Sequence, residues 1–203
     1  TIISMVTKYN VLNSIKAAGN PSTTNKIQYI YKQMANKFNE EKVENSSLNN
    51  FIKEQLDTVS PSLESIKKSK KVFDKGNETK GANEVKARDL AKYILVTLET
   101  ERIRLKGKNT ANKALKYVYD LSIEHIVDRK DQEEFGNIVY DLGNLVLLEN
   151  TEHTSSSDKK SMYENSIVNL IEDIRNNLDN FGEQAIKDRH DQLLEEFYKI
   201  VTN

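Results

Sequence analysis

Two histidines and an asparagine stand in an order that could do hydrolytic chemistry. His125 lies in the apolar run LSIEHIV, directly after Glu124, and the chain has only three histidines. A neutral imidazole can take a proton from water near neutral pH, so histidine suits the role of a general base. A strand would fix the direction of the ring, as that role requires. His125 is therefore a candidate general base.

Asn144 and His153 follow at a second strand-like run. Asn144 opens the run GNLVLLE at residues 143–149, and His153 lies in the polar stretch after it. The order of the three residues, on strand, strand and loop before a helix, resembles that of an HNH nuclease. We expect the backbone or amide of Asn144 to set the tautomer of His125. His153 and the carboxylate of Glu124 suit a divalent ion that keeps positions open for phosphate and water.

The geometry of a strand limits this arrangement. Neighbouring strand residues point to opposite faces, so Glu124 and His125 can reach one site only if the strand is bulged or ends there. Taken alone, His125 would be better explained as a hydrogen-bonded structural histidine, and a structural zinc site with His153 is a further alternative. His190 shares the last helix with apolar residues, so we interpret it as structural.

The elements that would position these residues belong to an α+β, mostly helical chain. Helical periodicity and capping residues predict helices, and short apolar runs predict two strands. We divide the chain into a helical region, 1–116, and an HNH-like (ββα-metal) hairpin-helix module with C-terminal helices, 117–203. The expected helices cover about 2–18, 22–38, 47–58, a turn begun by Pro61, 84–105, 110–118, 159–178 and 182–201; the expected strands cover 121–127 and 143–149, and residues 74–83 are a candidate linker.

Charge is unevenly distributed along the 203 residues, although the net charge is only −1. Residues 53–116 carry sixteen Lys and Arg against nine Asp and Glu, a net +7, whereas residues 117–203 carry eight against nineteen, a net −11. A basic segment attracts the phosphates of nucleic acid. The candidate DNA contacts are Arg102 and Arg104 on the helix over 84–105, and Lys159 and Lys160 where a later helix begins. Solvated helix faces would give the same charges without a DNA partner.

Composition excludes several other classes. Cysteine is absent, which removes disulfides and thiolate catalysis and fits a reducing compartment such as the cytoplasm. No apolar run approaches the roughly 18 residues of a membrane span, so no membrane association is expected. The chain begins at Thr1 without Met, and we expect it to be a piece of a longer protein.

A wider set of motifs resembles one nuclease family. IEHIV, DLGNLVLLE, His153 and then KKSMYENS are similar to the C-terminal HNH domain of GmrSD-type modification-dependent restriction enzymes and related anti-phage nucleases. The likeness covers about residues 84–178. It implies a DNA endonuclease with His125 as general base, Asn144 as the structural Asn, and Glu124 and His153 as ligands of a divalent metal (Mg²⁺ or Mn²⁺, with Ni²⁺ or Zn²⁺ possible).

The resemblance also implies partners, and it has departures. It implies DNA as substrate and an N-terminal sensor and NTPase domain in the same parent protein. Asp128 stands where the family usually has proline, and His153 stands where asparagine is commoner. Asn150 is the alternative metal ligand if the loop is aligned differently. The competing hypothesis is a catalytically weak DNA-binding or helical regulatory domain, which the acidic final third favours.

Overall fold

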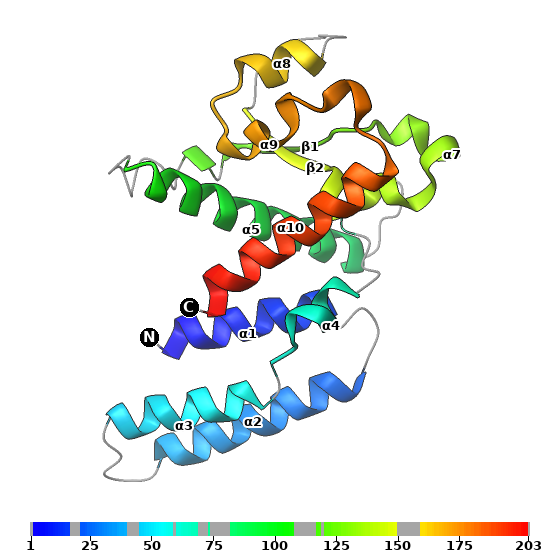
Figure 1. Ribbon diagram of the computed structural model, residues 1–203. Coiled ribbons are helices and arrows are strands. Elements are labelled where there is room, and N and C mark those ends of the chain that lie inside the picture. The colour runs from blue at the N-terminus through cyan, green and yellow to red at the C-terminus, as the bar shows by residue number, and fades with distance from the viewer. Residues whose placement is uncertain are drawn as a thin grey trace. The chain divides into compact units, whose positions relative to one another are not determined.

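The computed structural model describes residues 2–16, 21–39, 45–58, 60–68, 73, 82–107, 117–118, 120–149 and 159–202. Backbone contacts divide the chain into two compact units, Thr1–Lys71 and Val72–Val201. Most of the described residues are helical, and two strands form a small antiparallel sheet (Figure 1). The prediction of an α+β, mostly helical fold is confirmed.

The first unit consists of helices around a small apolar centre. Its helices are α1 (Ile2–Lys16), α2 (Pro21–Asn39), α3 (Asn45–Asp57) and α4 (Leu63–Lys67). Of these, α2 and α3 are clearly amphipathic. The buried side chains of Ile30, Ile52 and Leu56 form the centre. Ser62 caps α4 by accepting a hydrogen bond from the Ser65 N–H at 3.2 Å, so Pro61 precedes the cap and does not lie in the first turn.

The second unit surrounds the two strands with helices. Its elements are α5 (Ala82–Leu105), β1 (Ser122–His125), α7 (Gln132–Phe135), β2 (Leu145–Leu148), α8 (Lys159–Asn165), α9 (Glu172–Arg175) and α10 (Glu183–Thr202). α5 packs against β2 and against the turn at Asn169–Ile171. Figure 1 shows α8 on the other side of the strand pair from α5. The strand pair thus lies between α5, which precedes it in the chain, and α8, which follows it.

The two strands pair without a register irregularity. Ser122 lies opposite Leu148, and His125 lies opposite Leu145. All four residues of β2 are buried, whereas β1 alternates between buried and more exposed positions. Both strands lie within the predicted ranges but are shorter. β1 ends at His125, and the Val127 N–H beyond it bonds to the side chain of Asn144 instead of to a strand partner.

The predicted helix over 159–178 is wrong as a continuous element. α8 ends at Asn165, and the helical path resumes only at Asn169–Ile171 and α9. Two carboxylates from other parts of the chain capture the free N–H groups at the break. Glu149 accepts from the Ser166 hydroxyl (2.8 Å) and the Ile167 N–H (2.9 Å), and Glu99 accepts from the N–H groups of Asn169 and Leu170. Tertiary contacts therefore override the local helical pattern.

The division of the structure differs from the predicted boundary at 116/117. α5, which the sequence analysis placed with the helical region, belongs to the unit that holds β1 and β2. The reason is packing, since Ile94, Leu95 and Leu98 of α5 are buried and the helix contacts β2 directly. Helix α5 is therefore part of the support for the candidate site.

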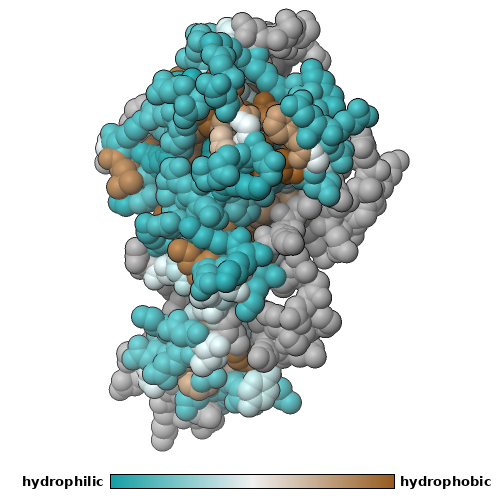
Figure 2. All heavy atoms as spheres, turned by 45° about the vertical axis from the view of Figure 1, so that its right-hand side comes forward, coloured by the Kyte–Doolittle hydropathy of each residue, from teal (hydrophilic) through white to brown (hydrophobic). Residues whose placement is uncertain are grey.

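The described surface is largely hydrophilic on the face drawn in Figure 2, with smaller hydrophobic areas between polar side chains. Among the described residues, Tyr29, Leu105 and Ile167 are the large hydrophobic side chains that stay exposed. No helix in the described parts of the chain is long and apolar enough to cross a membrane.

Candidate active site

His125 and Glu124 lie on opposite faces of β1. The His125 side chain is buried, with 7% of the residue exposed, whereas Glu124 is exposed. The four residue pairs between the strands contain no bulge, but β1 ends at His125. Glu124 and His125 could reach one site if the strand were bulged or ended there, and the second condition is met.

An aromatic ring limits the orientation of the His125 imidazole. The rings of His125 and Tyr140 meet edge to face, with centroids 6.4 Å apart and planes at 88°. Tyr140 is itself held, because its hydroxyl donates to Gln132 Oε1 at 2.7 Å and its carbonyl accepts from the Phe73 N–H at 3.0 Å. The imidazole therefore packs against a fixed wall.

Asn144 holds the backbone that leaves β1. Its Oδ1 accepts from the Val127 N–H at 2.8 Å, and its Nδ2 donates to the carbonyls of Val127 (2.9 Å) and Val139 (2.7 Å). The residue is fully buried. We expected the amide or backbone of Asn144 near the imidazole, but its side chain binds the peptide groups two residues after His125. Asn144 thus orients the end of the strand and not the ring itself.

Helix α10 supports the start of β2 through a buried arginine. Arg189 donates from Nη1 to the carbonyls of Gly143 (2.7 Å) and Leu145 (2.8 Å), on either side of Asn144. Burial lowers the pKa of Arg189 to about 10. The sequence analysis missed this residue. Its signal was a charged side chain within the apolar stripe of the last helix, formed by Ile186, Leu193 and Phe197.

His190 makes the contacts of a structural histidine. Its Nδ1 lies 2.6 Å from Asp141 Oδ1, and the same oxygen accepts from the Gly143 N–H at 2.8 Å. Its ring also meets Phe73 edge to face, with centroids 6.2 Å apart. These contacts link α10 to the turn before Asn144.

The two lysines at the start of α8 have different partners. Lys159 Nζ donates to the carbonyls of His125 (2.8 Å) and Ile126 (3.2 Å) and pairs with the Asp128 carboxylate. Burial would raise the pKa of Asp128, but Lys159 lowers it below its ordinary value. Lys160 pairs with Asp179 at 3.0 Å. Asp128, at the position where the family usually has proline, is thus a partner of Lys159.

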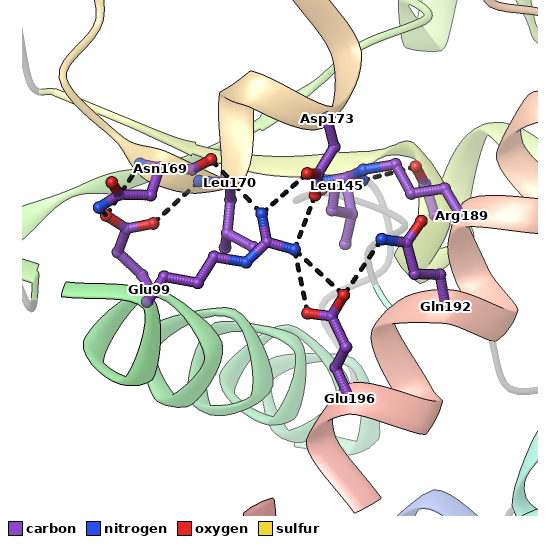
Figure 3. A network of polar contacts seen from close by, with 10 residues as sticks. Glu99, Leu145, Asn169, Leu170, Asp173, Arg189, Gln192 and Glu196 are labelled. Atoms are coloured by element: carbon purple, nitrogen blue, oxygen red, sulfur yellow. Dashed lines mark hydrogen bonds and ion pairs between the residues drawn. The ribbon is translucent and has the colours of Figure 1, made fainter. Parts of the chain in front are cut away.

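Arg102 and Arg104 lie in different environments on α5. The Arg102 guanidinium, with its side chain 19% exposed, pairs with Asp173 of α9 at 2.8 Å and with Glu196 of α10 at 2.9 Å. Burial would lower the pKa of Arg102, but these carboxylates raise it. Figure 3 shows the side chains of Asp173 and Glu196 pointing toward one another from their two helices. The Arg104 side chain is 68% exposed and pairs with Glu101 of the same helix at 2.5 Å. Arg104 is therefore far more accessible to DNA than Arg102.

The donors for a metal ion are only partly within the described residues. Glu124 is an exposed carboxylate at the end of β1, and its oxygen chemistry fits Mg²⁺ or Mn²⁺. His153 and Asn150 lie outside the described residues. In the described parts of the chain, no three His, Asp or Glu side chains gather closely enough to hold a metal ion.

Comparison with known proteins identifies the family. Residues 67–196 match the family described as GmrSD restriction endonucleases, C-terminal domain. The match covers more than half of the chain and nearly all of the second unit, and the chain belongs to this family. The search of curated proteins and the search of solved structures found no match. Family membership gives the chain a nuclease role of the restriction-endonuclease kind, with DNA as its substrate.

Proposed function

We propose that this chain is a metal-dependent DNA endonuclease of the HNH type, with His125 as general base. His125 takes a proton from a water molecule, the water oxygen attacks the phosphorus, and the bond to the leaving oxygen breaks. Membership of the restriction-endonuclease family supports the reaction class. We further propose that a sensor and NTPase domain in the same parent protein selects the DNA.

The observation that carries this proposal is the binding of Asn144 to the backbone beyond His125. A general base works only when its ring is held within a narrow range of positions. Asn144 fixes both polar groups of Val127, and Tyr140 packs against the imidazole. A histidine with no task beyond filling space would not need such support from two directions.

A divalent ion fits the donor chemistry of the proposed site. Glu124 would hold it from β1, with His153 as the second ligand and Asn150 as the alternative. When bound, such an ion neutralises charge on the phosphate and leaving oxygen. The residues of the chain do the rest, since His125 accepts the proton and Asn144 keeps the strand end in place.

We predict that cleavage requires a divalent metal and is at least as fast with Mn²⁺ as with Mg²⁺. The reason is that an imidazole ligand suits Mn²⁺ better than Mg²⁺. The measurement is conversion of supercoiled plasmid to nicked or linear DNA in Mg²⁺, Mn²⁺ or EDTA. His153→Ala should lower metal affinity and rate together, whereas His153→Asn should retain part of the activity. Undiminished cleavage in EDTA would contradict the metal requirement.

A second prediction concerns DNA binding by α5. Arg104→Glu should weaken DNA binding about equally for all sequences, because a phosphate contact carries no base information. It should reduce the slope of log affinity against log salt concentration by about 1. The matched control is Lys187→Glu, an exposed lysine of α10 that pairs with Glu183. Equal affinities and slopes for the wild type and Arg104→Glu would place α5 outside the DNA interface.

Two observations favour a catalytically weak DNA-binding or regulatory domain as the second candidate. His125 is only 7% exposed, and the guanidinium of Arg102 is already paired with two carboxylates. A regulatory domain would bind DNA or a partner without metal-dependent cleavage. The plasmid assay separates the two functions, because only the nuclease loses cleavage when His125 is replaced.

A further inference from the structure

Lys159 has an acceptor for each of its three ammonium protons. The carbonyl oxygens of His125 and Ile126 lie 2.8 and 3.2 Å from Nζ, and the Asp128 carboxylate is the third partner. An ammonium group has three N–H donors and no acceptor. Lys159 is therefore saturated by groups of its own chain, which leaves no donor for a phosphate unless one of these bonds breaks.

These bonds complete the hydrogen bonding of the backbone that follows the proposed base. Lys159 holds the carbonyls of His125 and Ile126. From the other side, Asn144 accepts from the Ile126 N–H through its carbonyl (2.9 Å) and binds the N–H and carbonyl of Val127 through its side chain. Every polar backbone group from the His125 carbonyl to the Val127 carbonyl thus has a partner, and two side chains provide most of them.

The position of Lys159 also links two elements. It is the first residue of α8, while its acceptors lie at and just beyond the end of β1. Without its ammonium, two carbonyls and a carboxylate would face each other with no donor between them. Such an arrangement is unfavourable, and the strand end would have to move to reach other donors.

We propose that Lys159 is a positioning residue for His125 and not a contact to DNA. This inference rests on the proposed role of His125 as general base, and it replaces the expectation that Lys159 binds phosphate. A displacement of about 1 Å at a catalytic group can cost 10²-fold in rate. Loss of Lys159 should therefore act on the rate of cleavage and leave DNA affinity almost unchanged.

The test compares Lys159→Met and Lys159→Arg with the control Lys187→Met. Methionine is similar in length without the charge, and arginine keeps the charge but cannot direct three protons to three convergent acceptors. We expect both Lys159 variants to cleave roughly 10- to 100-fold more slowly at saturating DNA, with dissociation constants within about twofold of the wild type. A phosphate contact would give the opposite pattern, with weakened binding in Lys159→Met and restored binding in Lys159→Arg.

A readout that is independent of cleavage is the NMR signal of the histidine rings. In Lys159→Met the Cε1–Hε1 signal of His125 should shift or broaden, while that of His190 should stay in place. Asp128→Asn keeps the lysine and removes the charge of one of its partners, so it should give a smaller shift. This variant replaces Lys159→Met in the test if Lys159→Met does not fold. An unmoved His125 signal in these variants, or a tenfold loss of affinity at unchanged rate, would overturn the proposal. Absence of cleavage by the wild type would instead refute the nuclease function, and the ring signals would still report the role of Lys159.

Discussion

His125→Ala should lower the rate of plasmid cleavage by about 10²–10⁴-fold, the usual cost of losing a general base. The imidazole packs against the ring of Tyr140, and Asn144 holds the backbone that follows His125. Alanine leaves no proton acceptor at this point. The rate should be measured at saturating DNA and metal, so that the loss reflects chemistry and not binding.

The control for this substitution is Tyr140→Phe. It keeps the ring that packs against His125 and removes only the hydroxyl that donates to Gln132. Its rate should stay within a few-fold of the wild type. The melting temperatures of both variants should be recorded, because His125 is buried. If folded His125→Ala cleaves as fast as the wild type, His125 has no part in the reaction.

Glu99→Gln should destabilise the second unit by about 2–4 kcal/mol, since hydrogen bonds to a charged group contribute about 1.5–3 kcal/mol each. The Glu99 carboxylate is fully buried and accepts three hydrogen bonds, from the Asn169 N–H (2.9 Å), the Asn169 side chain (2.6 Å) and the Leu170 N–H (3.0 Å). Figure 3 shows Glu99 reaching from α5 to these two residues. Glutamine has the same shape but turns an NH₂ group toward one of the donors.

The expected change in melting temperature is roughly 5–15 °C, measured by thermal unfolding. The matched control is Glu101→Gln on the same helix, where the carboxylate pairs with the exposed Arg104. A surface pair contributes about 0–1 kcal/mol, so this variant should melt close to the wild type. Equal melting temperatures for the two variants would show that Glu99 does not fasten α5 to the turn at Asn169.

The helices with a regular apolar face could be predicted from sequence, and the break between α8 and α9 could not. α2, α3 and α10 have such a face, which follows from the periodicity of their own residues. The break depends on Glu99 and Glu149, which approach from elements that are distant in sequence. No local pattern indicates that Leu170 will find its acceptor on α5.

The candidate site was predictable in its order but not in its contacts. Strand patterning put His125 within the first strand and Asn144 at the opening of the second. In the structure His125 is the last residue of β1, and Asn144 directly precedes β2. The partners of Arg102, Lys159 and Arg189 come from other elements, so their roles could be assigned only from the fold. A positive side chain in sequence does not reveal whether it faces DNA, a carboxylate or a backbone carbonyl.

Gly143 has a consequence for how mutations in this region would be interpreted. A Cβ at this position would lie 1.9 Å from the Ile186 carbonyl oxygen and 2.8 Å from the His190 nitrogen, both backbone atoms of α10. Even alanine would force the C-terminal helix away from the residue next to Asn144. A random-mutagenesis screen scored on activity would therefore rank Gly143 with the catalytic residues, although its constraint is the space left by a helix more than forty residues later in the chain. Evolution of the run LGN is restricted there by packing and not by chemistry.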